Sequence, residues 1–365
     1  MRVIFSVTND LNYDQRMIRI CNSLVNSGFN VKIIGVEFGN SSDLQLKKYT
    51  QKRIRLFFKK GFGFYLEYNV KLFFYLLFQK TDAFCCIDLD TMLPVYFAAF
   101  ILKKIKVYDA HEYFSQQKEI ITRPGIYKIW HFVERTFVPK FLNGYTVSEG
   151  IAKEFHKNYK VNYEVIRNVP VLKPLETINQ KEKIILYQGS VNEGRGFEFL
   201  IPAMKSVNAK LFVYGDGNFS DAARSLVTKH HLGDKILFAG KFLPDELNTM
   251  TPNAYIGINL VEQIGLNQFL SLANKFFNYI HYAVPQLTMN FPEYKKINEE
   301  FEVALLINSL SPIAIENSLN LLLNDDQLYR RLQQNCIKAR EVYHWQREEK
   351  KLISFYENIN STIKR

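Results

Sequence analysis

The stretch that decides the fold is Ile185-Leu-Tyr-Gln-Gly-Ser-Val-Asn-Glu-Gly-Arg195-Gly-Phe-Glu198, where an apolar strand passes into a glycine-punctuated loop and then a helix. The loop delivers Arg195 to the start of that helix. Loop amides, a helix N-terminus and a guanidinium that converge form an anion site suited to phosphate groups. A second segment, Asn274-Lys275-Phe-Phe-Asn278, places another cation in the first turn of a predicted helix. Two such sites in one α/β sequence predict a bound nucleoside diphosphate.

Short β-branched runs alternate with helical patterns on both sides of this stretch. The first pair is a predicted strand at Val3–Val7 and an amphipathic helix at Asp14–Ser27, which ends at Gly28. This alternation predicts parallel sheets covered by helices. The other predicted strands are Val31–Gly35, Ile54–Phe57, Phe84–Ile87, Lys106–Asp109, Gly144–Val147, Tyr163–Ile166, Ile184–Tyr187, Ala209–Tyr214, Lys235–Phe238, Tyr255–Ile258 and Gln286–Met289.

The alternation pauses at residues 167–177, which contain two prolines and no periodic pattern. Such a segment is typical of a linker between domains. We therefore expect two Rossmann-like, doubly wound α/β domains, at 1–170 and 171–345, that face a central cleft. Ligands of such sheets bind beyond the carboxyl ends of the strands, so the cleft is the expected active site.

The composition favours a globular protein with an anionic partner. The 365 residues include 47 Lys and Arg against 36 Asp and Glu, a formal charge of +11. The four cysteines show no metal-ligand spacing and indicate a reducing compartment. No apolar run reaches the roughly 18 residues that span a bilayer, and the N-terminus does not resemble a signal peptide. We expect a cytoplasmic protein.

Several motifs together resemble glycosyltransferase family 4, whose members are retaining enzymes of the glycosyltransferase-B fold. In the second half these are "YQGSVNEGRGFEFLIPAM" (187–204), "FVYGDGNF" (212–219) and "LANKFFNYIHYAVP" (272–285). In the first half "YDAHEYF" (108–114), "TVSEGIAKEF" (146–155) and "VIRNVP" (165–170) also match. The resemblance covers nearly the whole chain, and it implies that a C-terminal helix at about 346–365 packs back on the first domain.

The resemblance implies a role for particular residues of the second half. Arg195 corresponds to the cation that binds the donor diphosphate, and Lys275 lies in the donor-binding helix. The implied donor-binding residues are Gly189, Ser190, Gly196, Gly215, Gly217, Glu262, Asn274 and Asn278. Two positions depart from the family pattern: Asn278 stands where relatives have an acid, and Ser190 where many have an arginine. No cofactor and no obligatory metal are expected, and Asp88-Leu-Asp90 is interpreted as a strand-end turn.

In the first half the resemblance singles out His111, which follows a predicted strand and corresponds to a histidine beside the donor sugar. With Arg195 and Lys275 it forms the predicted catalytic set. Asp14, Arg16 and Glu112 are the candidate acceptor-binding residues. For Asp14 and Arg16 an ordinary helix N-terminus with a solvated arginine is an equal alternative, and Glu112 could serve to orient its loop.

The function implied is transfer of a sugar from a nucleotide-diphosphate sugar to a glycan or lipid-linked acceptor, in surface polysaccharide biosynthesis. A catalytically inactive nucleotide-sugar-binding relative is the main alternative, because of Asn278. A dinucleotide-dependent oxidoreductase is disfavoured, since no Gly-x-Gly-x-x-Gly follows the first strand. A nucleic-acid partner is not expected, because no recognition motif accompanies the positive charge.

A last prediction concerns the segment 47–78. Residues 47–60 contain seven Lys and Arg and no acid, and the aromatic-rich Phe62–Phe78 follows. Cations beside an amphipathic aromatic surface favour peripheral contact with an anionic membrane, here on its inner face. A solvated strand edge followed by a core helix is the competing interpretation.

Overall fold

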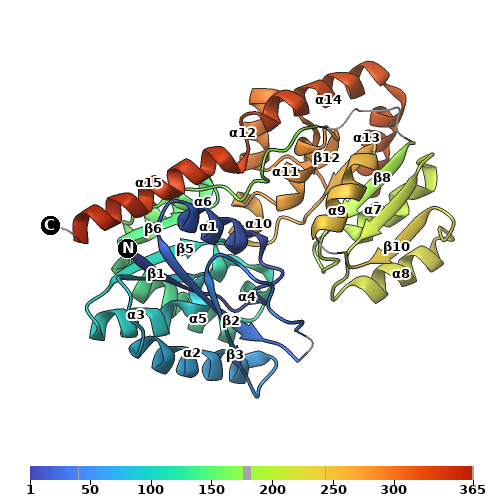
Figure 1. Cartoon of the computed structure of the whole chain (residues 1–365). Helices are drawn as coiled ribbons and strands as arrows, with labels where there is room; N and C mark the ends of the chain where they lie inside the picture. Colours follow the sequence, from blue (N-terminus) through green and yellow to red (C-terminus); the bar gives the residue numbers. More distant parts are fainter. Residues whose placement is uncertain (40, 176–181, 243, 364–365) are drawn as a thin grey trace. The chain divides into compact units, whose positions relative to one another are not determined.

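The computed structural model describes residues 1–39, 41–175, 182–242 and 244–363. The chain divides into two compact units (Figure 1). The first contains Met1–Arg167, Gly265–Asn267 and Glu348–Arg365, and the second contains Asn168–Ile264 and Gln268–Arg347. The predicted linker at 167–177 lies partly outside the described residues, which stop at 175 and resume at 182.

The first unit is built on a seven-stranded sheet in the order β3-β2-β1-β4-β5-β6-β7. Every pair is parallel, with Val3 of β1 opposite Val31 on one side and Ala83 on the other. The strand order reverses between β1 and β4, and the loops after these two strands form the usual ligand position of such a sheet. The strands are β1 Arg2–Ser6, β2 Asn30–Glu37, β3 Thr50–Arg55, β4 Ala83–Ile87, β5 Ile105–Ala110, β6 Asn143–Thr146 and β7 Glu164–Val165.

Helices cover both faces of this sheet (Figure 1). On one face lie α2 Gly61–Leu77, α3 Met92–Ile101 and α5 Pro124–Phe137; on the other lie α1 Gln15–Asn26, α6 Glu149–Tyr159 and the C-terminal α15 Trp345–Ile363. The short α4, Lys118–Ile121, precedes α5. Tyr356 of α15 packs edge-on against Phe5 of β1 and Phe29, with ring centroids 6.0 and 6.2 Å away. These aromatic contacts fix α15 to the sheet of the first unit.

The second unit repeats the architecture with six parallel strands in the order β10-β9-β8-β11-β12-β13. Its order reverses between β8 and β11. The strands are β8 Ile184–Gln188, β9 Lys210–Tyr214, β10 Ile236–Gly240, β11 Ile256–Asn259, β12 Gln286–Met289 and β13 Ala304–Ile307. The helices are α7 Phe197–Ala203, α8 Ser220–Lys229, α9 Pro244–Met250, α11 Asn274–His281, α12 Pro292–Phe301, α13 Pro312–Asn324 and α14 Asp326–Arg340. The short α10, Gly265–Leu270, begins with the three residues assigned to the first unit.

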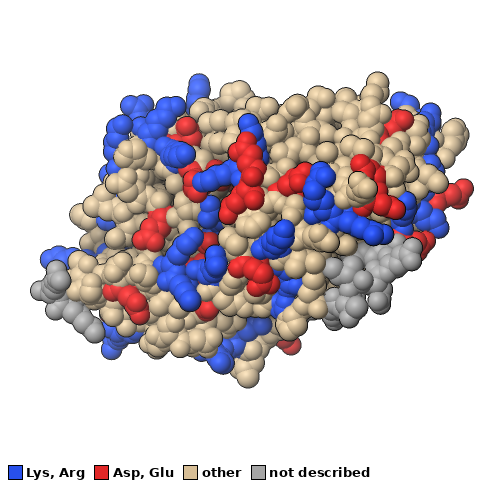
Figure 2. Space-filling view, turned by 90° about the horizontal axis from the view of Figure 1, so that it is seen from above, with Lys and Arg blue, Asp and Glu red and all other residues tan. Residues whose placement is uncertain are grey.

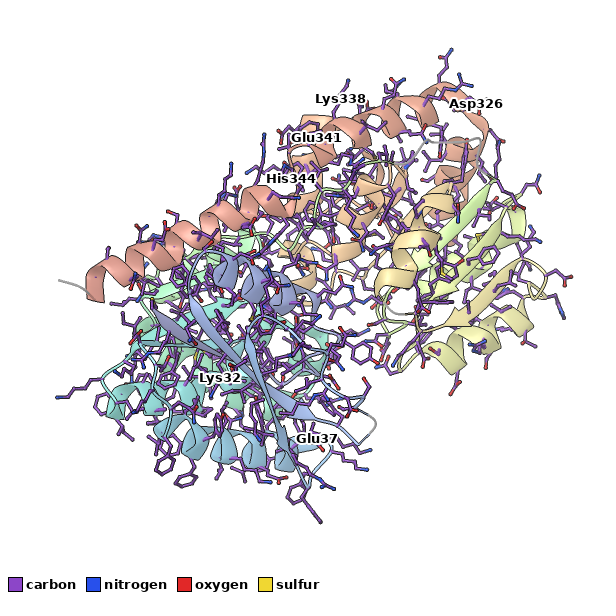
Figure 3. All side chains as sticks on the ribbon, in the orientation of Figure 1. Lys32, Glu37, Asp326, Lys338, Glu341 and His344 are labelled. Atoms are coloured by element: carbon purple, nitrogen blue, oxygen red, sulfur yellow. The ribbon has the colours of Figure 1, made fainter. Side chains whose placement is uncertain are left out.

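Charge placement supports the helices of this unit. In α14 Asp326 lies in the first turn and Lys338 in the last (Figure 3), which opposes the helix dipole at each end. Asp325 caps the same helix by accepting a hydrogen bond from the amide of Leu328 at 2.9 Å.

The predicted fold class is confirmed: each unit is a parallel sheet of Rossmann type. The strand predicted at Ile54–Phe57 is wrong in its boundaries, because β3 is Thr50–Arg55 and pairs with β2 from Lys32↔Thr50 to Glu37↔Arg55. Three elements were not predicted, namely α10, α12 and β13. All four cysteines lie among the described residues and are buried, and none of them forms a disulfide. None of the described helices is long and apolar enough to cross a membrane.

Candidate functional site

In the second unit the loop after β8 and the loop after β9 pack against each other at the carboxyl edge of the sheet. The amide of Gly189 donates to Tyr214 O at 2.9 Å, and that of Val191 donates to Asp216 O at 3.2 Å. A Cβ at Gly215 would lie 1.8 Å from Gly189 O, so the approach is possible only for glycine. These contacts bring two predicted donor-binding segments, 189–196 and 215–217, into one place.

The same loop also contacts the segment after β11. Gly196 has φ +75° and precedes α7, and a Cβ there would lie 3.2 Å from Leu260 Cβ. The amide of Glu262 donates to Gly194 O at 2.9 Å. The predicted site therefore lies beside the reversal between β8 and β11, where sheets of this type bind ligands. The helix α7 has seven residues and continues as the 3-10 turn Met204–Ser206.

Lys275, in the first turn of α11, reaches into this loop region. Its Nζ lies 3.5 Å from the ring centroid of Tyr187 on β8, which is a cation–π contact. Its Cε and Nζ lie 3.6 and 3.7 Å from the position that a Gly189 Cβ would take. The ammonium group thus lies directly beside the glycine loop, with no side chain of residue 189 between them.

The electrostatic environment of Lys275 favours the binding of an anion. Burial, together with the positive charge of Arg195, holds the pKa of Lys275 well below its usual range. Among the described residues no carboxylate lies within ion-pair distance of Arg195 or Lys275. Two neighbouring cations with no counter-charge are unfavourable alone, and a diphosphate would neutralise both.

Asn274 lies at the start of α11 but does not cap it. Asn274 is the first helical residue, and Ala273 occupies the N-cap, with its amide bonded to the Tyr294 hydroxyl at 3.0 Å. The Asn274 Oδ1 accepts instead from Asn168 Nδ2 at 2.7 Å. Asn278 is one turn further along the helix and is half-buried. Ser190 is exposed, and its carbonyl accepts from the Tyr187 hydroxyl at 2.6 Å.

In the first unit the predicted histidine belongs to a buried charged chain after β5. His111 Nε2 lies 3.0 Å from Asp109 Oδ2, and Asp109 Oδ1 accepts from Arg16 at 3.0 Å. Burial acts to raise the pKa of Asp109, but the charges of Arg16 and His111 outweigh it and lower the pKa. Arg16 is itself only 3% exposed and also donates to Ile166 O at 3.1 Å. It is therefore not solvated, and it holds the Asp109 carboxylate from the side opposite His111 Nε2.

Asp88 and Asp90 lie in the turn after β4, as interpreted from the sequence, but both carboxylates are involved in the site. Asp88 has φ +54°, and its Oδ1 accepts from the amides of His111 and Glu112 at 2.9 and 3.2 Å. Burial and the neighbouring acids hold the pKa of Asp88 well above its usual range. Burial also raises the pKa of Asp90 to about 7, although Thr8 donates to it at 2.6 Å. Asp88 thus fixes the turn that presents His111.

The other two acceptor-site candidates have structural partners. Asp14 is the N-cap of α1 and accepts from the amide of Met17 at 3.0 Å, as the helix-terminus alternative predicted. Glu112 accepts from Gln117 and, at 3.3 Å, from Asn267 Nδ2. Asn267 also accepts from the Tyr113 amide at 2.8 Å through its Oδ1. Residues 265–267 therefore belong to the first unit and hold the loop after His111.

A cavity of about 560 Å³ opens at the carboxyl ends of β2 and β3. Glu37, labelled in Figure 3, lies on its wall at the end of β2. Arg55 and Lys59 contribute cations, and Phe38 and Phe64 contribute apolar surface. Such a lining suits a molecule that has both apolar and anionic parts.

Several residues of these sites were not predicted. Tyr187 was part of the predicted strand, but a tyrosine in a strand gives no sign of a lysine above its ring. Asp109 lies in a matched motif and Asn267 in none, and their roles depend on contacts between segments more than 90 residues apart.

Comparison with known proteins bears on both units. Residues 170–339 match the family model Glycosyl transferases group 1. No curated protein is a significant match to the sequence. Among solved structures, sucrose-phosphate synthase (tll1590) from Thermosynechococcus elongatus has a TM-score of 0.80 at 14% identity, over 99% of this chain and 100% of that one.

Two further structures have the same fold along their whole lengths. WaaG, a glycosyltransferase involved in lipopolysaccharide biosynthesis, has a TM-score of 0.75 at 14% identity, over 96% of this chain and 98% of its own. Anabaena Alr3699/HepE, solved with UDP and glucose, has a TM-score of 0.75 at 11% identity, over 100% and 99%. Residues 170–339 thus resemble the Glycosyl transferases group 1 family, and the whole chain shares the two-domain fold of these solved structures.

Proposed function

We propose that the protein is a retaining family 4 glycosyltransferase, which moves a sugar from a nucleotide-diphosphate sugar to a glycan or lipid-linked acceptor in surface polysaccharide biosynthesis. The observation that supports this best is a pair of cations, Arg195 and Lys275, beside a glycine loop at the strand-order reversal of the second unit, with no carboxylate partner within the described part of the chain. The nucleotide-sugar complex of a protein with the same fold agrees with this proposal.

The proposed chemistry follows from the leaving group. Cleavage of the anomeric C–O bond leaves its electron pair, and so negative charge, on the departing diphosphate, while the sugar becomes electron-poor. Arg195 and Lys275 would stabilise that charge more strongly in the transition state than in the bound donor. The acceptor hydroxyl attacks the anomeric carbon from the same face, and its proton passes to an oxygen of the leaving phosphate.

We assign the remaining donor contacts to the loops around these cations. We assign the nucleoside to the backbone at Gly215 and Gly217, which packs on the loop after β8, and the diphosphate to Gly189, Ser190 and Gly196. Asn278 would bind ribose hydroxyls through its amide, and Glu262 the sugar. Asn274 would act by fixing the start of α11, because its side chain is bonded to Asn168.

In the first unit we assign the sugar contact to His111. Asp109 holds its Nε2, and Asp88 holds its backbone amide. Arg16 and Glu112 would act as positioning residues for this turn. We propose that no metal is required, since two fixed cations already match the charge of the diphosphate.

The test is thermal stabilisation of the full chain by UDP-, GDP- and ADP-sugars, with and without EDTA. One base should raise the melting temperature in both conditions, and Arg195→Ala should abolish the shift without lowering the melting temperature of the free protein. If none of the three nucleotide sugars stabilises the protein, the proposed donor site is refuted.

A catalytically inactive nucleotide-sugar binder is the second candidate, and Asn278 is the observation that favours it. Relatives place an acid here, and a neutral amide forms hydrogen bonds roughly half as strong as a carboxylate does. This candidate predicts donor binding without donor hydrolysis or transfer, and an Asn278→Glu variant that gains affinity without gaining turnover.

A further inference from the structure

One face of the first unit exposes an unusual amount of apolar surface. Of the 22 large apolar residues that are exposed in the described part of the chain, 11 lie on α2, α3 and α5 or directly after α2. Their exposed fractions run from 39% to 84%. They are Phe62, Leu66, Val70, Phe74, Phe78, Phe97, Phe100, Ile101, Ile126, Ile129 and Phe132. We call this set the α2–α3–α5 face.

The pattern within α2 shows why this surface exists. The side that packs on the sheet uses Phe64, Tyr68, Leu72 and Leu76, which are buried at intervals of four residues. A second stripe of apolar residues, from Phe62 to Phe78, follows the same interval on the outside. A surface helix of a water-soluble domain normally has polar residues there.

The exposed residues form one continuous surface, because α3 packs against both α2 and α5. A groove of about 270 Å³ runs between α2 and α3, and its exposed lining is entirely apolar. Val70, Phe73 and Phe74 line it from α2, and Phe97 and Ile101 line it from α3. Apolar patches of this extent on a monomer usually mark a binding surface.

The charges on these elements are mostly positive. Residues 57–80, 92–106 and 123–140 contain eleven Lys and Arg but only two acids, Glu67 and Glu134. Glu134 is buried, and Glu67 pairs with Lys71 at 2.7 Å and accepts from the amides of Phe57 and Phe58. By contrast, on the face seen from above in Figure 2, basic and acidic side chains are interspersed.

Two of the cations lie against an aromatic side chain of α3. Lys106 and Lys140 place their Nζ atoms 5.1 and 5.2 Å from the ring centroid of Tyr96 on α3. Lys103 and Lys128 are exposed at the end of α3 and on α5. An apolar centre surrounded by cations is the arrangement that binds an anionic bilayer, with aromatic side chains at headgroup depth and lysines at the phosphates.

We propose that the α2–α3–α5 face docks the protein on an anionic lipid bilayer. The docking itself does not depend on the proposed function. Its benefit rests on that function, because docking would bring a lipid-linked acceptor to the enzyme. The segment 47–78, for which the sequence predicts membrane contact, contributes α2 to this face, whereas the contribution of α3 and α5 was not predicted. Arg53 does not belong to it, since its guanidinium is 8% exposed and pairs with Asp10 at 2.6 Å.

The test is co-sedimentation of the full chain with vesicles of phosphatidylcholine alone or with added phosphatidylglycerol. We expect binding only to the anionic vesicles, and weaker binding at high salt. A Phe62→Ser/Phe74→Ser/Phe97→Ser variant should bind at least about tenfold more weakly, because three aromatic side chains no longer enter the interface. A Leu237→Ser/Ile313→Ser variant, altered at exposed apolar residues of the second unit, should bind like the wild type.

A second variant reports on insertion. Phe97→Trp should show fluorescence that is quenched by lipids brominated in their acyl chains, and Lys103→Glu/Lys128→Glu should weaken binding without changing the melting temperature. Equal binding of all variants, or no binding to anionic vesicles, would overturn the proposal. So would a dimer in light scattering that the triple serine variant dissociates, because the face would then join two copies. Donor-induced thermal stabilisation, measured on the same variants, separates this outcome from failure of the proposed function.

Discussion

At the scale of single residues, Lys275 shows most directly how the second unit could act. Its ammonium group lies over the Tyr187 ring beside Gly189, near Arg195 and without a carboxylate partner among the described residues. Burial and a neighbouring cation lower the pKa of this ammonium group, whereas a bound anion would raise it. Its protonation should therefore depend on whether the site is occupied.

This coupling predicts a pH dependence of donor binding. The pKa of Lys275 is low in the free protein and should rise when a diphosphate lies beside it, so binding takes up a proton and the affinity falls as pH rises. Titration calorimetry in buffers of different ionisation enthalpy measures that uptake. Lys275→Arg, which stays charged, should remove the dependence. Unchanged proton uptake in that variant would contradict the prediction.

A second residue-scale prediction concerns stability. The pKa of Asp90 is about 7 in the folded protein and about 3.9 in an unfolded chain, so its contribution to stability falls as pH rises between these values and stays low above them. Asp90→Asn should therefore raise the free energy of unfolding by up to about 4 kcal/mol near pH 8, with little gain near pH 4. Urea denaturation at the two pH values measures the difference.

Asp82→Asn is the matched control. Its carboxylate is partly exposed and pairs with Arg2 at 3.2 Å. Although burial opposes the effect, hydrogen bonds from Arg2 lower its pKa, so this substitution should destabilise slightly near pH 8. A gain from Asp90→Asn that is equal at both pH values would contradict the assignment.

The sequence was sufficient to place Arg195 in a glycine loop, Lys275 in the first turn of a helix and His111 directly after a strand, because such positions follow from local patterns. It was not sufficient for Arg16, which looks like a surface residue in an amphipathic helix. Its burial depends on Asp109, 93 residues away, and on Ile166 O. Local sequence does not determine a contact of that kind.

At the scale of elements, the glycines of the second unit decide how closely its loops approach. The loops after β8 and β9 are joined by backbone hydrogen bonds at Gly189 and Val191, and there is no room for a Cβ at Gly215 or Gly217. The element boundaries were predictable where a strand is buried on both faces, as in Gln286–Met289. The boundaries of β3 were not predictable, because only Ile54 of its six residues is buried.

This close approach gives a prediction for glycine substitutions. Gly215→Ala should separate the two loops, because its Cβ would meet Gly189 O at 1.8 Å. We expect a loss of about 2 kcal/mol or more in stability and a larger relative loss of donor affinity. Gly233→Ala, in the same unit and with no heavy atom within 4 Å of its Cβ, is the control. Differential scanning fluorimetry with and without donor measures both effects, and the melting temperatures of the control should equal those of the wild type. Similar effects of the two substitutions would contradict the explanation.

At the scale of the whole molecule, two parallel sheets of the same type divide the candidate chemistry between them. In the proposed function the second unit supplies the cations for a diphosphate, and the first unit supplies a histidine oriented by acids and the proposed face for an anionic bilayer. The overall charge of +11 is consistent with both anionic partners. The alternation of strands and helices was sufficient to predict both sheets. The insertion of residues 265–267 into the first unit was not predictable, because no composition change marks it.

The central claim is that Arg195 and Lys275 bind a diphosphate. The most direct measurement compares, by calorimetry, the affinities of a nucleoside diphosphate and the monophosphate of the same base for the wild type and for Arg195→Ala/Lys275→Gln. The wild type should prefer the diphosphate by about tenfold or more, since charge-assisted contacts contribute about 1.5 kcal/mol or more each. The double variant should bind both weakly and nearly equally. An undiminished preference for the diphosphate in that variant would contradict the account.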